Sequence, residues 1–291
     1  MRTQISLSIQ MHHENSGSKP GLCTSSSGCY NSPPMRLLKI LLIACLTLAT
    51  PLRAEEIRIA AAADLRFAME EIIGQFRKSH PNDSIDVTYG SSGKFHAQIQ
   101  NGAPFDLFFS ADIALPRQLL QAGLGSGEVK PYAIGRIVVW RPGKDSPAPT
   151  LAGLAGPGIR RVAIANPRHA PYGMRAVEAL KAAGVWAAVE NKLIFGENIA
   201  QTAQFVQTGN ADAGIIALSL AITPEYAGKG QYVPIPSELH QPLEQGYLLL
   251  KRAENKPAAR SLSEFMGSAA ARDILVRYGF QLPGSPRKQT P

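Results

Sequence analysis

The chain has 291 residues, of which 45% are hydrophobic and 18% are charged. This size and composition fit a folded protein of about two domains and exclude a chain that is disordered throughout. The formal net charge is +8, but half of it falls within residues 1–54, which contain five basic residues and one acidic residue, Glu14. Because the other half is spread thinly, without a dense Lys/Arg block, a nucleic acid is not an expected partner.

The N-terminal segment has the features of a leader. Residues 1–34 are rich in Ser, Gly and Asn and are predicted to be a disordered extension upstream of the true start at Met35. Residues 35–54 combine a basic start, a short apolar core and a small final residue, as a secretory signal peptide does. The prediction is export to the periplasm as a soluble protein, and the alternative is a lipoprotein anchored at Cys45, which ends a lipobox-like stretch. All three cysteines lie in this leader, so the mature chain has no disulfide or thiol chemistry.

From Glu56 onward, short apolar runs alternate with stretches of helical periodicity, in which residues such as Leu65, Met69 and Ile72 fall on one face. The predicted strands are 57–62, 85–89, 107–110, 134–140, 161–165, 192–195, 213–217 and 247–250. The predicted helices are 65–77, 94–101, 113–122, 173–183, 199–208, 256–266 and 268–277. Repeated βα units predict an α/β fold with a mainly parallel sheet and helices on both faces.

Four predicted loops lead from a strand into a helix: residues 62–64, 90–93, 166–173 and 196–199. In such folds ligands bind beyond the C-terminal ends of strands, next to helix N-termini. The N–H groups at a helix start have no partner within the helix and bind anions without any Lys or Arg. Helix capping alone explains each loop taken singly. Their recurrence favours convergence on one anion site.

Other chemistries fit the sequence less well. The stretch Gly90-Ser-Ser-Gly-Lys94 lacks the spacing of a nucleotide-binding P-loop. A serine hydrolase in the periplasm is a distant alternative, and its candidate residues are Ser91, Ser92, His96, His169, Asp64 and Asp106. Against it, the Gly-x-Ser-x-Gly elbow is missing. Neither a two-histidine pair at helical spacing nor a cysteine cluster is present for a metal. We therefore expect no catalysis and no cofactor.

Six segments stand in order along the chain: residues 60–69 (AAAADLRFAM), 90–93 (GSSG), 101–106 (NGAPFD), 109–112 (FSAD), 166–173 (NPRHAPYG) and 277–280 (RYGF). Together they resemble the periplasmic molybdate-binding proteins of the ModA family, which supply an ABC transporter. The resemblance implies a type II periplasmic binding protein, in which two α/β lobes joined by two crossover segments close on one ligand. The implied division is 55–135 and 236–283 for lobe one, 136–235 for lobe two and 284–291 for a loose tail.

The function implied by the resemblance is that of an exported, monomeric carrier without catalytic activity. Its ligand would be molybdate, with tungstate as well, bound with high affinity and delivered to the membrane permease of an ABC transporter. The small oxyanion would be held by hydroxyls and backbone N–H groups, with no residue bonded directly to the metal atom. A carrier for another oxyanion, such as sulfate or phosphate, is the nearer alternative.

The resemblance places the oxyanion-binding positions at Ala63, Asp64, Ser92, Tyr172, Ile199 (through its N–H) and Ala217. Ala217 has no hydroxyl where the family often has tyrosine, and Tyr172 is expected to supply one instead. Asp64 stands where the family commonly has Ser or Asn, and an ionised carboxylate would repel a dianion. The preferred interpretation is that Asp64 turns away and caps the 65–77 helix. Alternatively it is protonated and donates to the ligand, or the ligand carries a proton that Asp64 accepts.

Overall fold

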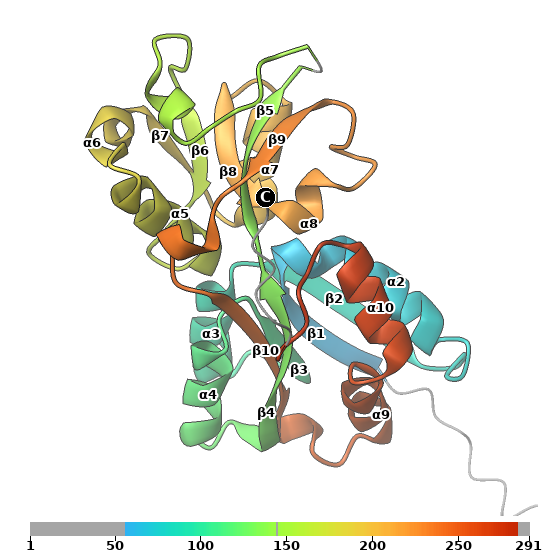
Figure 1. Ribbon diagram of the computed structural model, residues 1–291. Helices are drawn as coiled ribbons and strands as arrows, with labels where there is room; N and C mark the ends of the chain where they lie inside the picture. The colour runs from blue at the N-terminus through green and yellow to red at the C-terminus, as the bar shows by residue number, and fades with distance from the viewer. Residues whose placement is uncertain (1–55, 144, 285–291) are drawn as a thin grey trace, which may run out of the picture. The chain divides into compact units, whose positions relative to one another are not determined.

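The computed structural model describes residues 56–143 and 145–284 (Figure 1). The predicted N-terminal extension, the signal peptide with Cys45 and most of the predicted tail lie outside the described residues. The strands form two five-stranded sheets, in the orders β2-β1-β3-β10-β4 and β7-β6-β8-β5-β9. Within the described ranges, no helix has the length and apolar character that crossing a membrane requires.

The first sheet consists of β1 (Glu56–Ala62), β2 (Ser84–Gly90), β3 (Leu107–Ser110), β4 (Gly125–Gly135) and β10 (Leu243–Leu250). Side chains alternate between the two faces of a strand, and β1 is apolar on both. Ile57, Ile59 and Ala61 belong to one core cluster, whereas Ala60 belongs to another. The sheet is therefore covered by helices on both faces, as predicted, and we call this assembly the first lobe.

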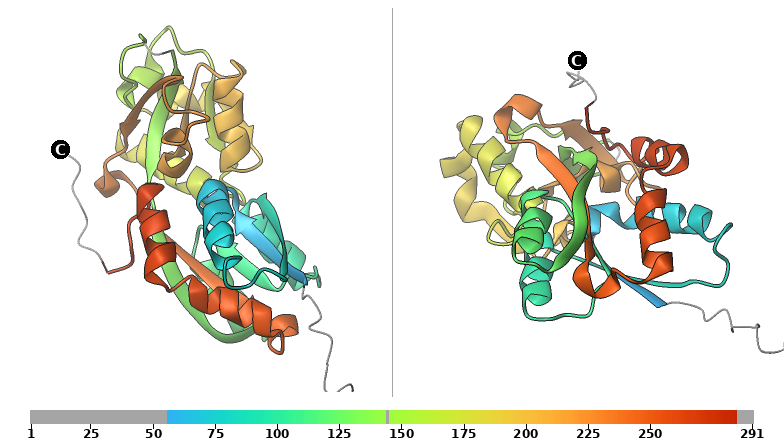
Figure 2. Two further views of the ribbon diagram at one scale, coloured as in Figure 1. Left: turned by 90° about the vertical axis from the view of Figure 1, so that its right-hand side faces the viewer. Right: turned by 90° about the horizontal axis from the view of Figure 1, so that it is seen from below.

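The first cluster also contains residues of α2 (Arg66–Phe76), α9 (Pro257–Phe265) and α10 (Ala269–Arg277). The second contains residues of α3 (Ser92–Gln100) and α4 (Ala114–Gln121). Helices α2 and α10 lie side by side although they are far apart in the sequence (Figure 2). An ion pair between Glu71 and Arg277 joins them. Short 3-10 turns, η1 (Ala63–Leu65) and η5 (Lys251–Ala253), follow β1 and β10.

The second lobe is built on the other sheet, formed by β5 (Ile137–Pro142), β6 (Val162–Ala165), β7 (Leu193–Gly196), β8 (Ala213–Ala217) and β9 (Gly230–Pro234). Its helices are α5 (Pro171–Ala182), α6 (Trp186–Val189), α7 (Ile199–Gln207) and α8 (Leu218–Ala221), with 3-10 turns η2 (Ala152–Ala155), η3 (Glu190–Lys192) and η4 (Ser237–Leu239). One large apolar cluster, centred on strands such as β6 and β8, joins the sheet to these helices. Trp140 is its largest fully buried side chain.

The predicted α/β class with two crossovers is confirmed, but the prediction of mainly parallel sheets is wrong. In the first sheet, β1 pairs parallel with β2 and β3, while β10 pairs antiparallel with β3 and β4. The second sheet is mixed in the same way around β5. The antiparallel pairings arise because the chain passes between the sheets twice, from β4 to β5 and from β9 to β10. The predicted strand 134–140 straddles the first passage, at Arg136.

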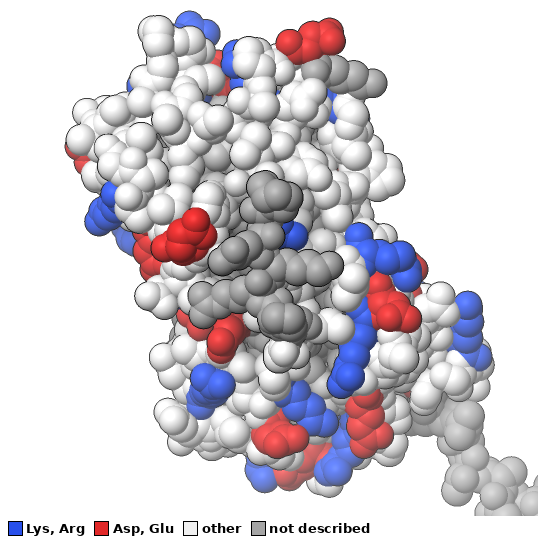
Figure 3. Space-filling view, viewed as in Figure 1, with Lys and Arg blue, Asp and Glu red and all other residues white. Residues whose placement is uncertain are grey.

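Charged side chains are interspersed on the face of the molecule shown in Figure 3. Elsewhere in the described ranges as well as here, charges of opposite sign lie close together, and the ion pairs include Arg66 with Glu70 and Lys251 with Glu254. The described part of this face therefore carries no broad field of one sign, which agrees with the even spread of charge read from the composition.

Candidate anion-binding site

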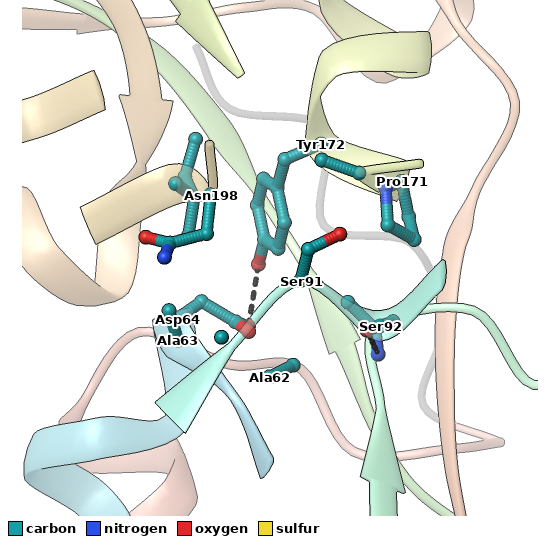
Figure 4. Close-up of a pocket in the computed structure, with 12 residues that line it drawn as sticks. Ala62, Ala63, Asp64, Ser91, Ser92, Pro171, Tyr172 and Asn198 are labelled. Atoms are coloured by element: carbon teal, nitrogen blue, oxygen red, sulfur yellow. Dashed lines mark hydrogen bonds between the residues drawn. The ribbon is translucent and has the colours of Figure 1, made fainter. Parts of the chain in front are cut away.

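A narrow pocket lies where loops of the two lobes meet (Figure 4). The residues that line it lie at the ends of β1, β2 and β3 in the first lobe and at the starts of α5 and α7 in the second. The lining residues are Ala62, Ala63, Asp64, Gly90, Ser91, Ser92, Ala111, Ala170, Pro171, Tyr172, Asn198 and Ile199. The four predicted loops thus converge on one place. Ala217 is not in this lining and is instead buried at the end of β8, opposite Ile137.

Three helices start at the pocket, with Ser92 opening α3, Pro171 opening α5 and Ile199 opening α7. The first N–H groups of a helix have no carbonyl partner within the helix and carry the positive end of its dipole. In α7, the Asn198 side chain caps the N–H groups of the next turn, at Ala200 and Gln201, both at 3.0 Å. The Ile199 N–H precedes them, at the pocket wall. This arrangement suits a small anion.

Ser92 supplies a hydroxyl from the first lobe. Its side chain is buried, and its Oγ accepts a hydrogen bond of 3.0 Å from the Ala111 N–H. A hydroxyl has one hydrogen to donate as well as lone pairs to accept. Because Oγ is already an acceptor for Ala111, its own hydrogen remains available to a ligand in the pocket.

Asp64 does not cap a helix, so the preferred interpretation of its side chain is wrong. Neither η1 nor α2 has a side-chain cap. Instead, Asp64 Oδ2 accepts a hydrogen bond of 2.8 Å from the Tyr172 hydroxyl (Figure 4). It accepts a second one, of 2.7 Å, from Gln245 Nε2. Two long-range donors thus outcompete the local N–H groups that a cap would use. The hydroxyl hydrogen of Tyr172 is directed at this carboxyl group, and its donation to a ligand stays a prediction.

Two residues behind the pocket were missed by sequence reasoning. Gln245 of β10 is buried, and its Oε1 accepts a 2.5 Å hydrogen bond from the hydroxyl of Tyr132 in β4. Its Nε2 also lies 3.1 Å from the Tyr172 hydroxyl. Both strands carry the chain between the lobes. No local pattern marks either residue, because their role depends on contacts more than a hundred positions away.

Gly135, the last residue of β4, is packed against this network. A Cβ added there would meet the Tyr172 hydroxyl and would lie 2.6 Å from Gln245 Nε2. We expect Gly135→Ala to displace both donors and to destabilise the protein by ~1–3 kcal/mol, the usual cost of overpacking. Thermal unfolding measures this, with Gly158→Ala as control because a Cβ there has nothing within 4 Å. An unchanged melting temperature for Gly135→Ala would contradict the packing described.

The two lobes also touch beside the pocket. The His169 carbonyl oxygen accepts from the Gly93 N–H at 2.9 Å and from the Ser91 hydroxyl at 2.6 Å. Lys94 forms an ion pair with Glu197, whose carboxylate lies 3.6 Å from His169 Nε2. Because the contacts of Ser91, Gly93 and Lys94 join α3 or the loop before it to the second lobe, these residues hold the pocket closed.

The candidate hydrolase residues do not assemble into a triad. Ser91 Oγ lies 2.9 Å from His169 Nδ1, but the hydroxyl is also bonded to the His169 carbonyl. The two candidate acids have other partners: Asp64 bonds to Tyr172 and Gln245, and Asp106 pairs with Lys256 at 2.9 Å. Within the described ranges, no group of three or more His, Cys, Asp or Glu residues is placed to hold a metal ion.

Comparison with known proteins gives a consistent result. The profile of the family described as "Bacterial extracellular solute-binding protein" matches residues 57–281. The molybdate-binding protein ModA of Azotobacter vinelandii is 35% identical over 236 residues, which cover 81% of this chain and 93% of the relative. ModA of Rhodobacter capsulatus is 33% identical and covers 80% and 91%. The solved structure of the Azotobacter vinelandii periplasmic molybdate-binding protein superposes with a TM-score of 0.70 at 31% identity, covering 78% of this chain and 99% of that one.

These matches confirm the type II fold and the predicted resemblance, because they extend over nearly the whole described chain. They also confirm the expectation of a solute-binding protein rather than an enzyme. The chain therefore belongs to the ModA family of bacterial extracellular solute-binding proteins.

Proposed function

We propose that this protein is exported to the periplasm, binds molybdate, and tungstate with it, and delivers the anion to the permease of an ABC transporter. The observation that carries this proposal is the pocket of neutral donors, where three helix starts meet the Ser92 hydroxyl. No Lys, Arg or His is among the residues that line it in the described chain. The names of the relatives above support molybdate as the ligand.

The proposed ligand-binding residues are Ala63, Asp64, Ser92, Tyr172 and Ile199, all of which line the pocket. Ala217 is left out of this proposal because it lies outside the lining. Selectivity over sulfate would follow from size, since a smaller tetrahedral anion makes longer and weaker hydrogen bonds to the same donors. We propose a monomer, with lobe boundaries near 135 and 235, where the chain leaves one sheet for the other.

Thermal unfolding of the purified protein with molybdate, tungstate, sulfate and phosphate tests the ligand. A ligand present at about a thousandfold its dissociation constant adds ~4 kcal/mol of stability, which raises the melting temperature by several degrees. We expect this rise with molybdate and tungstate and little change with the other two. A rise with sulfate or phosphate alone would indicate a carrier for a different oxyanion.

The Ser92→Ala variant tests the donor assigned to the first lobe. It removes a charge-assisted hydrogen bond, worth ~1.5–3 kcal/mol, and molybdate affinity is expected to fall about 10- to 100-fold. The exposed Ser84 provides the matched control, and Ser84→Ala should bind like the wild type. If Ser92→Ala binds molybdate as tightly as the wild type, Ser92 is not a ligand donor.

A further inference from the structure

The two carboxyl oxygens of Asp64 have different surroundings. Oδ2 accepts from Tyr172 and Gln245, whereas Oδ1 is buried and has no hydrogen-bond partner among the described residues. The residue is 1% exposed and is one of those that line the pocket. A buried polar atom without a partner is costly and calls for an explanation. A ligand in the pocket would provide the missing partner.

The network fixes which oxygen of Asp64 can carry a proton. The Tyr132 hydroxyl donates to Gln245 Oε1, and this bond turns the amide nitrogen of Gln245 towards Asp64. The single hydroxyl hydrogen of Tyr172 is also directed at Oδ2. Burial, together with the Asp64 carboxyl group, holds the pKa of Tyr132 and of Tyr172 well above its usual value, so both remain neutral donors. With two donors on Oδ2, only Oδ1 has room for a hydrogen.

The groups that contact Asp64 are neutral. The groups that face it are Tyr172 from α5, Tyr132 from β4, Gln245 from β10 and the Ser219 hydroxyl of α8, which binds the Asp64 carbonyl. None of them is charged. Burial raises the pKa of Asp64 to about 6, although hydrogen bonds from Gln245, Tyr172 and its own backbone lower it. The carboxyl group is therefore poised to change its protonation near neutral pH.

A cluster of charged groups lies beside the pocket, where the lobes touch. His169, Lys94 and Glu197 form the cluster beside Ser91 and Gly93. Burial lowers the pKa of His169, as do Lys94 and Arg168, while Glu197 raises it. His169 is thus a second titratable group near the pocket and has to be separated from Asp64 by experiment.

We propose that the oxyanion binds together with one proton, which is held on Oδ1 of Asp64 and donated as a hydrogen bond to an oxygen of the anion. This inference rests on the proposed function and specifies how the site tolerates a carboxyl group. An ionised Asp64 would repel a dianion inside a closed pocket, whereas the neutral acid repels nothing and adds a donor. The proton comes from solvent and forms the O–H bond of the Asp64 carboxyl group, and no other covalent bond in the protein or the anion changes.

The expected consequence is an affinity that depends on pH. Above the pKa of the free site, the dissociation constant for molybdate rises about tenfold per pH unit, because each binding event has to restore the proton. Between about pH 6.5 and pH 8.5 the loss amounts to roughly 50- to 100-fold. Over this range molybdate itself stays a dianion, so the dependence belongs to the protein.

Isothermal titration calorimetry with sodium molybdate, in two buffers of different protonation enthalpy, measures both affinity and proton uptake. We expect uptake of about one proton per anion near pH 8, where Asp64 is ionised in the free protein. Asp64→Asn places an N–H donor where the acid has its O–H, and it should remove both the proton uptake and the pH dependence while tightening binding near pH 8. His169→Gln is the matched control. Its dissociation constant should change with pH as steeply as that of the wild type, even if its affinity differs.

The outcomes separate this inference from the proposed function. Saturable molybdate binding by the wild type without proton uptake and without pH dependence would overturn the proton-coupled site and leave the carrier function intact. The proton-coupled site would also be overturned if the pH dependence of molybdate affinity disappeared in His169→Gln and persisted in Asp64→Asn. If neither the wild type nor Asp64→Asn binds any of the four oxyanions at any pH, the proposed function itself fails. The uptake measurement on the wild type needs no variant to fold.

Discussion

Replacing Gly93 by alanine is expected to weaken molybdate binding about 10- to 100-fold, because overpacking of ~1–3 kcal/mol would oppose closure of the lobes. A Cβ on Gly93 would lie 2.5 Å from the His169 carbonyl oxygen and 3.0 Å from its Cα. Both neighbours are backbone atoms of the opposite lobe, so no side-chain rotation relieves the clash. The Gly93 N–H bond to His169 would be lost with it.

The same change should leave the free protein nearly as stable as the wild type, because the nearest atoms to the added Cβ all belong to His169. The measurement is molybdate affinity together with thermal unfolding in the absence of ligand. Gly74→Ala is the control, since nothing lies within 4 Å of a Cβ at that helical position. Wild-type affinity in Gly93→Ala would show that binding does not require this contact.

The stability of the ligand-free protein is expected to fall as pH rises through the window from about 4 to 6, in part because of Asp64. Its pKa is about 6 in the fold, against an ordinary value of 3.8. Within this window the folded protein still holds a proton that the unfolded chain has released, so each step up in pH favours unfolding. The difference amounts to ~3 kcal/mol at neutral pH.

Asp64→Asn should therefore be more stable than the wild type above neutral pH, by up to ~3 kcal/mol, and should gain nothing near pH 4. Urea unfolding across this range measures the difference. Asp86→Asn makes the same chemical change at an exposed position of β2 and should shift stability by less than ~0.5 kcal/mol. An equal gain from both variants, or a gain from Asp64→Asn that does not depend on pH, would refute a destabilising carboxylate at position 64.

The place of the site was predictable from the sequence because it depends on local signals. Glycine, serine and proline between an apolar run and a helical pattern mark a strand end followed by a helix start. Four such loops could be found in sequence, and residues from all four line the pocket. The helix predicted at 94–101 begins two residues earlier, at Ser92. The place of the pocket is therefore encoded in short segments of the sequence.

The inner network was not predictable in that way. Asp64 lies ahead of a helix, where capping is the local preference, but its partners are Tyr172 and Gln245, which are 108 and 181 positions away. The strand β4 was also missed, because its sequence GSGEVKPYAIG contains Pro and three Gly and pairs with β10 through register shifts. Such features depend on the fold as a whole.

Titration of the wild-type protein with molybdate, followed by calorimetry at about pH 6.5, tests the central claim most directly. The account predicts one saturable site per chain with a dissociation constant at or below about 1 μM, equivalent to at least ~8 kcal/mol of binding free energy, and much weaker binding of sulfate. Absence of saturable heat with molybdate, or equal affinity for sulfate, would contradict it.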